Sequence, residues 1–278
     1  MRAAYLVAAM DAVRRSSSLF ALVPSLLALL FGVLPRVIWA GIGTPLPTIA
    51  DQVLNGVQAG EAFGTGSATA GDVNGDGYSD LIVGMPDYDN GALTNAGRVM
   101  VFHGSPTGLS ATPAWTMTGS TANARFGASV STAGDVNGDG YSDIIIGAPG
   151  HLSQGGAFVY HGSATGLSAT VSWSVLGGET GSNFGACVAL AGDVNGDGVS
   201  EVLVGAPLMN ASGTDRGQVR CYAGATGTGL SAVALWTSSG TQSYAYFGFS
   251  IAGAGDVNGD GRSDVVVGEP NYDASAVD

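Results

Sequence analysis

One six-residue string, Asp-Val-Asn-Gly-Asp-Gly, occurs four times in this 278-residue chain and constrains its fold more than any other feature. The copies begin at Asp72, Asp135, Asp193 and Asp256, so they are 63, 58 and 63 residues apart. Such a period is typical of chains in which one supersecondary unit is copied and each copy buries its apolar face against the next. The chain is therefore predicted to be a repeat protein.

Three further features keep the same register as the string. A Phe-Gly pair stands nine residues before each copy, at Phe63-Gly64, Phe126-Gly127, Phe184-Gly185 and Phe247-Gly248. A Gly-x-Pro triplet begins twelve residues after each first Asp, at Gly84, Gly147, Gly205 and Gly268. Eleven residues before each phenylalanine stands Gln52, Trp115, Trp173 or Trp236. Large aromatic side chains at a regular place in a strand are expected to pack inside the sheets.

The apolar runs within each repeat are short, and they are separated by Gly, Asn, Asp, Ser and Pro, which end strands and form turns. In the second repeat these runs cover residues 128–132, 144–146, 157–160 and 170–175. No helical period appears after residue 50. Four strands in about 60 residues fit the blade of a β-propeller, whereas the units of a stacked solenoid are usually shorter.

The three motifs at these spacings resemble the FG-GAP repeat, the blade of the integrin alpha-subunit propeller. The resemblance covers residues 50–278. It implies an all-β propeller, usually of about seven blades, with calcium loops on one face and a role in adhesion or extracellular binding. The fold class expected here is a β-propeller of four-stranded FG-GAP blades, present as an incomplete segment of about three and a half blades.

The spacing of the motifs also predicts the domain boundaries. Residues 41–60 are expected to be a lead-in and the outer strand of a preceding blade, and the blades to span 61–120, 121–178, 179–241 and, in part, 242–278. A closed propeller needs at least about four blades. We therefore expect further blades in a longer chain, with self-association that completes the ring as the alternative.

Residues 1–40 differ from the repeats. Arg14 and Arg15 precede an apolar run at 19–34, and the small residues Ala40 and Gly41 follow it. This order is typical of a secretory signal, so cleavage is predicted after Ala40. The alternative is an uncleaved membrane anchor, although the run is shorter than the roughly 20 residues that a span needs. Both interpretations predict an exported protein, secreted or at the cell surface, with no other membrane contact.

Each Asp-rich string opens a nine-residue segment with oxygen-bearing side chains at positions 1, 3, 5 and 9. Position 7 can add its backbone carbonyl, and Gly at position 6 permits a sharp turn. This pattern suits a hard cation that takes about six to eight oxygen ligands. The predicted ligands are Asp72, Asn74, Asp76, Tyr78 and Asp80; Asp135, Asn137, Asp139, Tyr141 and Asp143; Asp193, Asn195, Asp197, Val199 and Glu201; and Asp256, Asn258, Asp260, Arg262 and Asp264.

An EF-hand would need Glu at position 12 and a following helix. Position 12 is Val83, Ile146, Val204 or Val267, and strands are expected to follow. Asp, Asn and Gly are also ordinary turn formers, but that role does not account for three carboxylates within nine residues. We predict up to four structural Ca²⁺ ions, because many protein oxygens in a flexible loop favour Ca²⁺ over Mg²⁺.

The charge balance supports cation binding and excludes one class of partner. The chain has 22 acidic residues and nine basic ones, all Arg, for a net charge of −13, and the four segments contain 12 of the acidic residues. Phosphate backbones repel a chain this acidic, so nucleic acid is not an expected partner.

The sequence contains no recognised enzyme signature. His103 and His161 occupy equivalent places at predicted strand ends, with no acid or nucleophile fixed beside them. Cys187 and Cys221 are predicted on the first and third strands of one blade, about 9–10 Å apart and too far for a disulfide. We therefore predict two buried free thiols, no catalytic residue and no cofactor other than Ca²⁺.

The function expected from the sequence is that of an exported, calcium-stabilised propeller that binds an unknown extracellular protein or glycan. On this interpretation it is an adhesion or binding module and not an enzyme. The first alternative is an accessory propeller of a larger secreted enzyme that acts on polysaccharide or phospholipid. The second is a purely structural surface protein.

Overall fold

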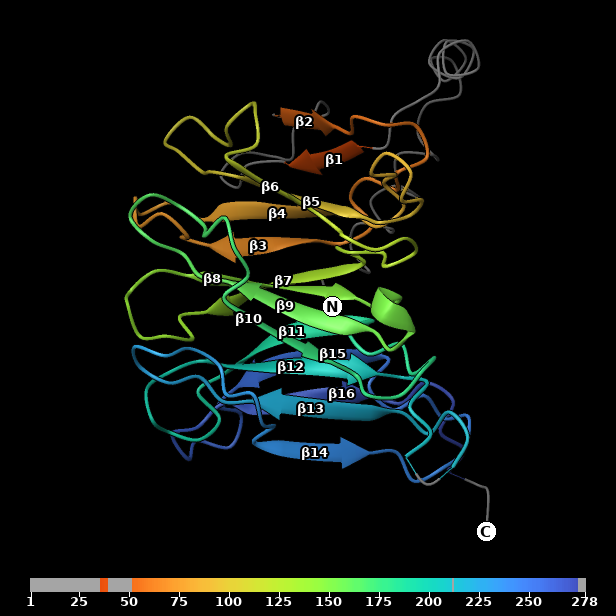
Figure 1. Ribbon diagram of the computed structural model, residues 1–278. Helices are drawn as coiled ribbons and strands as arrows, with labels where there is room; N and C mark the ends of the chain where they lie inside the picture. The colour runs from red at the N-terminus through yellow and green to blue at the C-terminus, as the bar shows by residue number, and fades with distance from the viewer. Residues whose placement is uncertain (1–35, 40–51, 212, 275–278) are drawn as a thin grey trace, which may run out of the picture. The chain divides into compact units, whose positions relative to one another are not determined.

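Antiparallel strands dominate the part of the chain that the computed structural model describes, which is residues 36–39, 52–211 and 213–274 (Figure 1). The first complete sheet contains β3 (Ser67–Gly71), β4 (Asp80–Met85), β5 (Arg98–Phe102) and β6 (Trp115–Thr118). The second contains β7 (Ser129–Gly134), β8 (Asp143–Ala148), β9 (Gly156–Tyr160) and β10 (Trp173–Leu176). The third contains β11 (Cys187–Gly192), β12 (Glu201–Ala206), β13 (Gln218–Tyr222) and β14 (Trp236–Ser239). Each strand pairs with the next in chain order, so the predicted class of four-stranded β-sheets is confirmed.

Two strand pairs flank these sheets. β15 (Ser250–Gly255) and β16 (Asp264–Gly268) occupy the first and second strand positions of a fourth unit. β1 (Arg36–Trp39) pairs with β2 (Gln52–Asn55), with Trp39 opposite Gln52. This register matches that of β5 and β6, where Val101 lies opposite Trp115. β1 and β2 therefore take the third and fourth strand positions of a preceding unit.

The strand β1 is a difference from the sequence interpretation, which assigned residues up to 40 to a leader. Its residues Val37-Ile38-Trp39 continue the apolar character of the preceding run, so composition alone does not separate a strand from the end of a leader. Residues 1–35 and 40–51 lie outside the described residues. The rest of the leader prediction, the predicted cleavage after Ala40 and most of the predicted lead-in fall on them.

The strand limits in the second repeat differ slightly from those predicted. The outer strand begins at Trp173 and not at Thr170. The Ser168 hydroxyl donates to the Thr170 carbonyl at 2.7 Å, which holds the residues before Trp173 in a turn. A short 3-10 helix, η1 (His151–Ser153), lies between β8 and β9.

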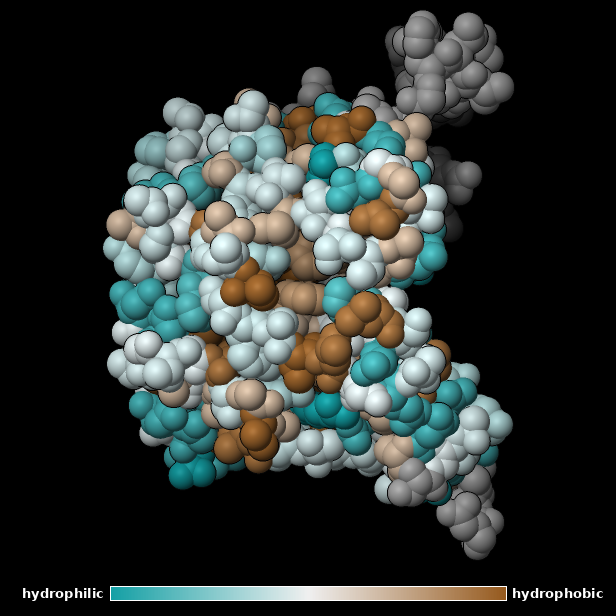
Figure 2. Space-filling model, in the orientation of Figure 1, coloured by the Kyte–Doolittle hydropathy of each residue, from teal (hydrophilic) through white to brown (hydrophobic). Residues whose placement is uncertain are grey.

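The apolar core lies between neighbouring sheets. The first strands approach one another in the series β3, β7, β11 and β15. The first three sheets follow in this order in Figure 1. One cluster joins Ile82 and Val99 of the first sheet to Ile144 and Ile146 of the second, and all four side chains are buried. On the face shown in Figure 2, apolar residues form separate patches among polar ones. Sheets that meet through their first strands in this way have the arrangement of propeller blades.

The Phe-Gly and Gly-x-Pro motifs meet at each junction between sheets. Within a repeat, the Phe-Gly glycine donates its N–H to the Gly-x-Pro glycine carbonyl, as Gly127 does to Gly147 at 3.0 Å. Across the junction, a Cβ on Gly147 would collide with the carbonyl oxygen of Gly185, which belongs to the Phe-Gly pair of the next repeat. Gly84 and Gly205 are placed in the same way. The motifs are therefore the contact points at which backbone packs on backbone.

The tryptophans do more than pack within their own sheets. The indole N–H of Trp115 donates to the Ser168 carbonyl of the next sheet at 2.9 Å, and its ring lies edge-on to Tyr160 with centroids 4.9 Å apart. Trp173 bonds to the Ser231 carbonyl in the same way at 3.0 Å. Gln52 takes the equivalent place with its amide, which donates to the Leu109 carbonyl at 3.0 Å. The side chain at this position therefore links the outer strands β2, β6 and β10 to the following sheet.

We expect Gly147→Ala to lower the free energy of unfolding by about 3 kcal/mol, because backbone atoms of Gly185 cannot move aside for the new methyl group. The matched control is Gly91→Ala, where φ is +64° but no atom lies within 4 Å. The control should lose only about 1 kcal/mol through backbone strain. Urea unfolding of both variants checks this, and equal losses would contradict the role assigned to the junction.

Candidate metal loops

The four nine-residue segments all occupy the turn between the first and second strands of their units. We call them loop 1 (72–80), loop 2 (135–143), loop 3 (193–201) and loop 4 (256–264). Position 1 directly follows the first strand, and position 9 is the first residue of β4, β8, β12 or β16. The structure therefore brings the five predicted ligand residues of each loop into one turn.

A β-bulge leads into every loop. In the first sheet the register shifts between Thr69 and Gly71, and Gly71 has a φ of +78°. The Thr69 hydroxyl accepts a hydrogen bond from the Gly71 N–H at 3.1 Å. The same shift precedes the other loops, at Gly134, Gly192 and Gly255. A bulge bends its strand and re-aims the residues that follow, so it directs the position-1 aspartate into the turn.

The position-1 carboxylate organises the turn through backbone amides. Asp72 accepts hydrogen bonds from the N–H groups of Gly75 (2.8 Å), Asp76 (3.1 Å) and Gly77 (2.8 Å). Asp256 of loop 4 does the same with Gly259, Asp260 and Gly261. In loop 4 these bonds, with that from Gly261 first, hold the pKa of Asp256 below its usual value.

Positions 3, 5 and 7 are joined in turn. In loop 1 the Asn74 carboxamide oxygen accepts the Asp76 N–H at 3.1 Å, and its amide donates to the Asp76 carboxylate at 2.9 Å. Asp76 also accepts the Tyr78 N–H at 2.9 Å. The bond from Asn74, followed by that from Tyr78, lowers the pKa of Asp76. Equivalent bonds from position 7 to position 5 recur in loops 2, 3 and 4.

The position-9 carboxylates are buried in the three complete sheets. Asp80 is 2 % exposed, and Asp143 and Glu201 are fully buried. Asp143 accepts N–H bonds from Val136 (2.9 Å) and from Gly162, which lies just beyond β9 (2.8 Å). Burial is nevertheless the larger effect, and it raises the pKa of Asp143 to about 7. Burial likewise raises the pKa of Asp80 and of Glu201.

The donor set fits a hard cation. Each loop offers three carboxylates, one carboxamide and a position-7 carbonyl, and none of its carboxylates forms an ion pair with a basic side chain in the described part of the chain. Across that same part, no group of three or more His, Cys, Asp or Glu side chains forms a ready cluster. The fit therefore rests on the alternating oxygen donors of one turn and on the uncompensated charge. A bound cation would offset that charge and hold positions 1–9 together.

One residue of the site was missed by the sequence interpretation. Position 8 is serine in every loop: Ser79, Ser142, Ser200 and Ser263. The N–H of Ser142 donates to the carbonyl of Asp72 in the preceding loop at 3.0 Å, so this residue joins neighbouring loops. The fourfold repetition was a signal, but serine at the end of a turn is also an ordinary solvent-facing residue.

The other candidate side chains do not form a catalytic group. His103 directly follows β5 and lies 3.3 Å from the Asn74 amide, measured from its Nδ1, and His161 directly follows β9. Cys187 on β11 and Cys221 on β13 are free, with β12 between them, as predicted. Cys187 is half-buried and not buried as expected. No helix among the described residues is long and apolar enough to span a membrane.

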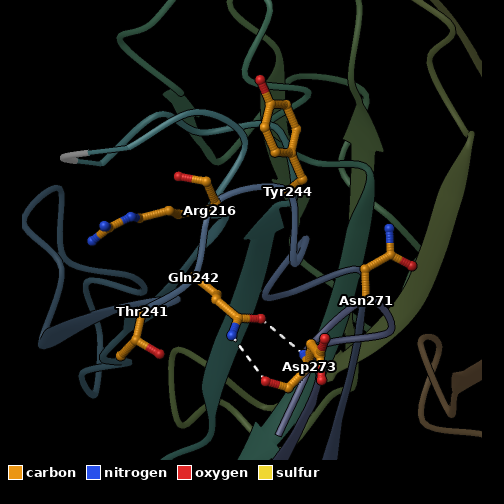
Figure 3. A pocket seen from close by; sticks show the side chains of 7 residues that line it. Arg216, Thr241, Gln242, Tyr244, Asn271 and Asp273 are labelled. Atoms are coloured by element: carbon orange, nitrogen blue, oxygen red, sulfur yellow. Dashed lines mark hydrogen bonds between the residues drawn. The ribbon is translucent and has the colours of Figure 1, made fainter. Parts of the chain in front are cut away.

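A polar hollow of about 520 Å³ lies at the opposite ends of the strands from the loops (Figure 3). Its lining includes Arg216, Gln242, Tyr244 and Asn271. Gln242 exchanges two hydrogen bonds with the backbone of Asp273, at 2.9 and 2.8 Å. In Figure 3 the labelled side chains do not converge on one point, so the hollow does not have the arrangement of a catalytic centre.

Comparison with known families agrees with this architecture. A model of the FG-GAP repeat matches residues 63–102 and 126–160, and a model of the FG-GAP-like repeat matches residues 193–267. Together the matches span more than half of the chain. The chain belongs to the FG-GAP repeat family. The matches at 63–102 and 126–160 each contain the first three strands of one sheet with the loop between the first two, whereas the match at 193–267 begins at loop 3 and continues through loop 4.

Two kinds of relative share these repeats. Bovine phosphatidylinositol-glycan-specific phospholipase D is 31% identical over 222 residues, which are 73% of this chain and 26% of that protein. Mouse integrin alpha-IIb is 39% identical over 163 residues, 55% of this chain and 16% of the integrin. Integrin alpha-5 of Xenopus laevis is 32% identical over 195 residues, 66% of this chain and 18% of the integrin. The chain thus matches about a quarter or less of the length of these relatives.

We expect Asp143→Ala to lower the free energy of unfolding by about 2 kcal/mol in EDTA, because the buried N–H groups of Val136 and Gly162 lose their acceptor. Asp143→Asn is the matched control, since it keeps an acceptor oxygen and removes the buried charge. The free energy of unfolding should fall less in Asp143→Asn than in Asp143→Ala. Urea unfolding in EDTA measures both, and a larger loss for Asn would show that the charge itself stabilises the metal-free loop.

Proposed function

We propose that this FG-GAP protein is an exported binding module whose loops each hold a structural Ca²⁺ ion. The observation that carries the proposal is the fourfold recurrence of one oxygen-rich turn in one structural position, with carboxylates that no basic side chain of the described residues neutralises. Calcium is favoured over magnesium because these turns offer up to five protein oxygens in irregular geometry, whereas Mg²⁺ usually retains several waters. The ion would fasten the first two strands of each unit together.

The binding partner is proposed to be an extracellular protein or a glycan, contacted away from the loops. The loops occupy one end of the strands. The linkers and Gly-x-Pro turns, with the polar hollow near Arg216, occupy the other end. A metal that fixes one end leaves the other end free to vary, and function commonly resides on variable loops held by a rigid scaffold. Adhesion is the role suggested by the integrin relatives.

A second proposal is favoured by the phospholipase D relatives, which align over 73% of this chain. Here the repeats would be an accessory propeller of a larger secreted enzyme. The described residues contain no constellation of catalytic side chains, so the chemistry would belong to another part of such a protein. A catalytic motif in the reading frame beyond codon 278 would favour this proposal over adhesion.

Calcium should raise the thermal stability of the protein. A ligand that binds only the folded state contributes about 2.7 kcal/mol per site at a free concentration 100 times its Kd. One such site would raise the Tm by about 5–10 °C, and several sites by more. Thermal unfolding in EDTA and in millimolar Ca²⁺ measures this effect.

The control replaces the four position-5 aspartates by Asn (Asp76, Asp139, Asp197 and Asp260), which keeps one acceptor oxygen for the position-7 N–H and removes the charge. This variant should respond weakly to Ca²⁺. An equal Tm for the native protein in EDTA and in Ca²⁺ would contradict the metal proposal. So would an equal rise in Mg²⁺ at the same ionic strength, because it would indicate general charge screening.

Export is tested by the N-terminus of the mature protein. The predicted cleavage after Ala40 would give a chain that begins at Gly41 and lacks β1. N-terminal sequencing of protein recovered from the medium or the cell surface checks this. A mature chain that begins before Arg36 would retain β1 beside β2 and show that the cleavage site is wrong. Retention of the chain inside the cell would contradict export itself.

A further inference from the structure

Neighbouring loops are tied together by a backbone hydrogen bond that recurs at all three junctions. In each case the position-8 serine of one loop donates its N–H to the position-1 aspartate carbonyl of the loop before it. The bonds are Ser142 to Asp72 (3.0 Å), Ser200 to Asp135 (3.2 Å) and Ser263 to Asp193 (2.8 Å). The loops therefore form one hydrogen-bonded series and are not separate turns.

Two further contacts strengthen this tie. The position-2 carbonyl of Val73 accepts the N–H of Ser163, and that of Val136 accepts the N–H of Ala225, both at 3.1 Å and both from the next sheet. The bulge glycines before loops 1, 2 and 3 have no Cβ where the next serine lies. A methyl group on Gly134 would come within 2.5 Å of the Ser200 hydroxyl, and Gly71 and Gly192 face their serines in the same way.

The hydrogen bond between position 8 of one loop and position 1 of the loop before it lies among the predicted metal ligands. Position 1 is a ligand residue, and position 8 lies between the ligand residues 7 and 9. One hydrogen bond thus joins a ligand residue of one site to the segment that carries two ligands of the next. A cation that orders one loop also restricts its neighbour, which then has less conformational entropy to lose when it binds.

We propose that the four loops bind Ca²⁺ with positive cooperativity, each occupied loop raising the affinity of the loops directly beside it. This inference rests on the proposed calcium function. The hydrogen bonds determine which loops are coupled. Loop 2 is bonded to a loop on each side, through Ser142 and Ser200, whereas loop 4 is bonded only to loop 3 among the described residues.

Electrostatics acts in the opposite direction. A bound divalent ion lowers the negative potential at the adjacent loop and so weakens its attraction for a second ion. Positions 4 to 6 of loop 1 are exposed, and exposed charges are screened over about 8 Å at 0.15 M ionic strength. Ordering should therefore dominate in physiological salt, and the cooperativity should decrease as the salt concentration is lowered.

The test is a calcium titration of the full chain, labelled with ¹⁵N and followed by NMR. The position-6 glycines Gly77, Gly140, Gly198 and Gly261 each donate their N–H to the position-1 carboxylate of their own loop at 2.8 Å, so each amide signal reports one site. The variant Asp139→Asn weakens loop 2, and its matched control Asp260→Asn weakens loop 4.

We expect Asp139→Asn to lower the affinities of loops 1 and 3 by at least about fivefold, the lower end of coupling between sites. The same variant should lower the Ca²⁺ affinity of loop 4 by a smaller factor. Asp260→Asn should lower the Ca²⁺ affinity of loop 3 and leave that of loop 1 nearly unchanged. Unfolding midpoints in EDTA establish that both variants are folded.

Unchanged affinities of the remaining loops in both variants would overturn the cooperativity, as would an equal fall at every loop regardless of position. Failure of the native chain to show any calcium-dependent shift would instead refute the calcium proposal, and the cooperativity with it. A second variant, Ser142→Ala, removes the 3.2 Å bond from the Asp72 N–H to the Ser142 hydroxyl and keeps the backbone tie. It should reduce the coupling between loops 1 and 2 only, and a reduction elsewhere would count against the proposed route.

Discussion

The structure depends on the close approach of two backbones wherever one sheet meets the next. The carbonyl of a Phe-Gly glycine lies against the Cα of the Gly-x-Pro glycine in the preceding repeat, and no side chain fits between them. This contact fixes how deeply neighbouring sheets can pack, and the apolar side chains of Ile82 and Ile144 fill the space that it leaves. Because the contact recurs at equivalent residues, every loop is presented at the same place beside its neighbour.

The negative charge of the loop carboxylates is the second constraint, and the hydrogen bonds of the fold compensate it only in part. The position-9 carboxylates of the three complete sheets begin buried strands, where desolvation opposes ionisation and raises the pKa of Asp143 to about 7. Backbone amides of the loop and of the segment just beyond the third strand partly offset this cost, as those of Val73 and Gly104 do for Asp80. No basic side chain of the described residues completes the compensation. The metal-free loop is therefore pre-shaped by hydrogen bonds but still carries uncompensated negative charge, and this combination favours a cation as its ligand.

The sequence predicted the features that depend on local chemistry. The spacing of Gly, Asp and Asn placed all four loops between strands. The short apolar runs predicted the ends of β7, β8 and β9 to within about two residues. The features that the sequence did not predict depend on contacts between repeats. The indole of Trp115 bonds to Ser168, and the N–H of Ser142 to Asp72, across 53 and 70 residues of sequence. Neither partner is marked by composition, because a main-chain carbonyl looks the same at every residue.

The two kinds of relative indicate what such a module can be. Phosphatidylinositol-glycan-specific phospholipase D and integrin alpha chains differ in what their names describe, yet both align with these repeats over about a quarter or less of their own length. Within this chain, the features that recur in every repeat are the junction glycines and the loops. The end of the strands that carries the Phe-Gly and Gly-x-Pro motifs also carries residues that the repeats do not share: Arg216 and Tyr244 border a hollow, and the Thr121 hydroxyl lies 3.1 Å from Nδ1 of His151. The family resemblance therefore identifies the scaffold, and a shared fold does not by itself specify what a protein binds.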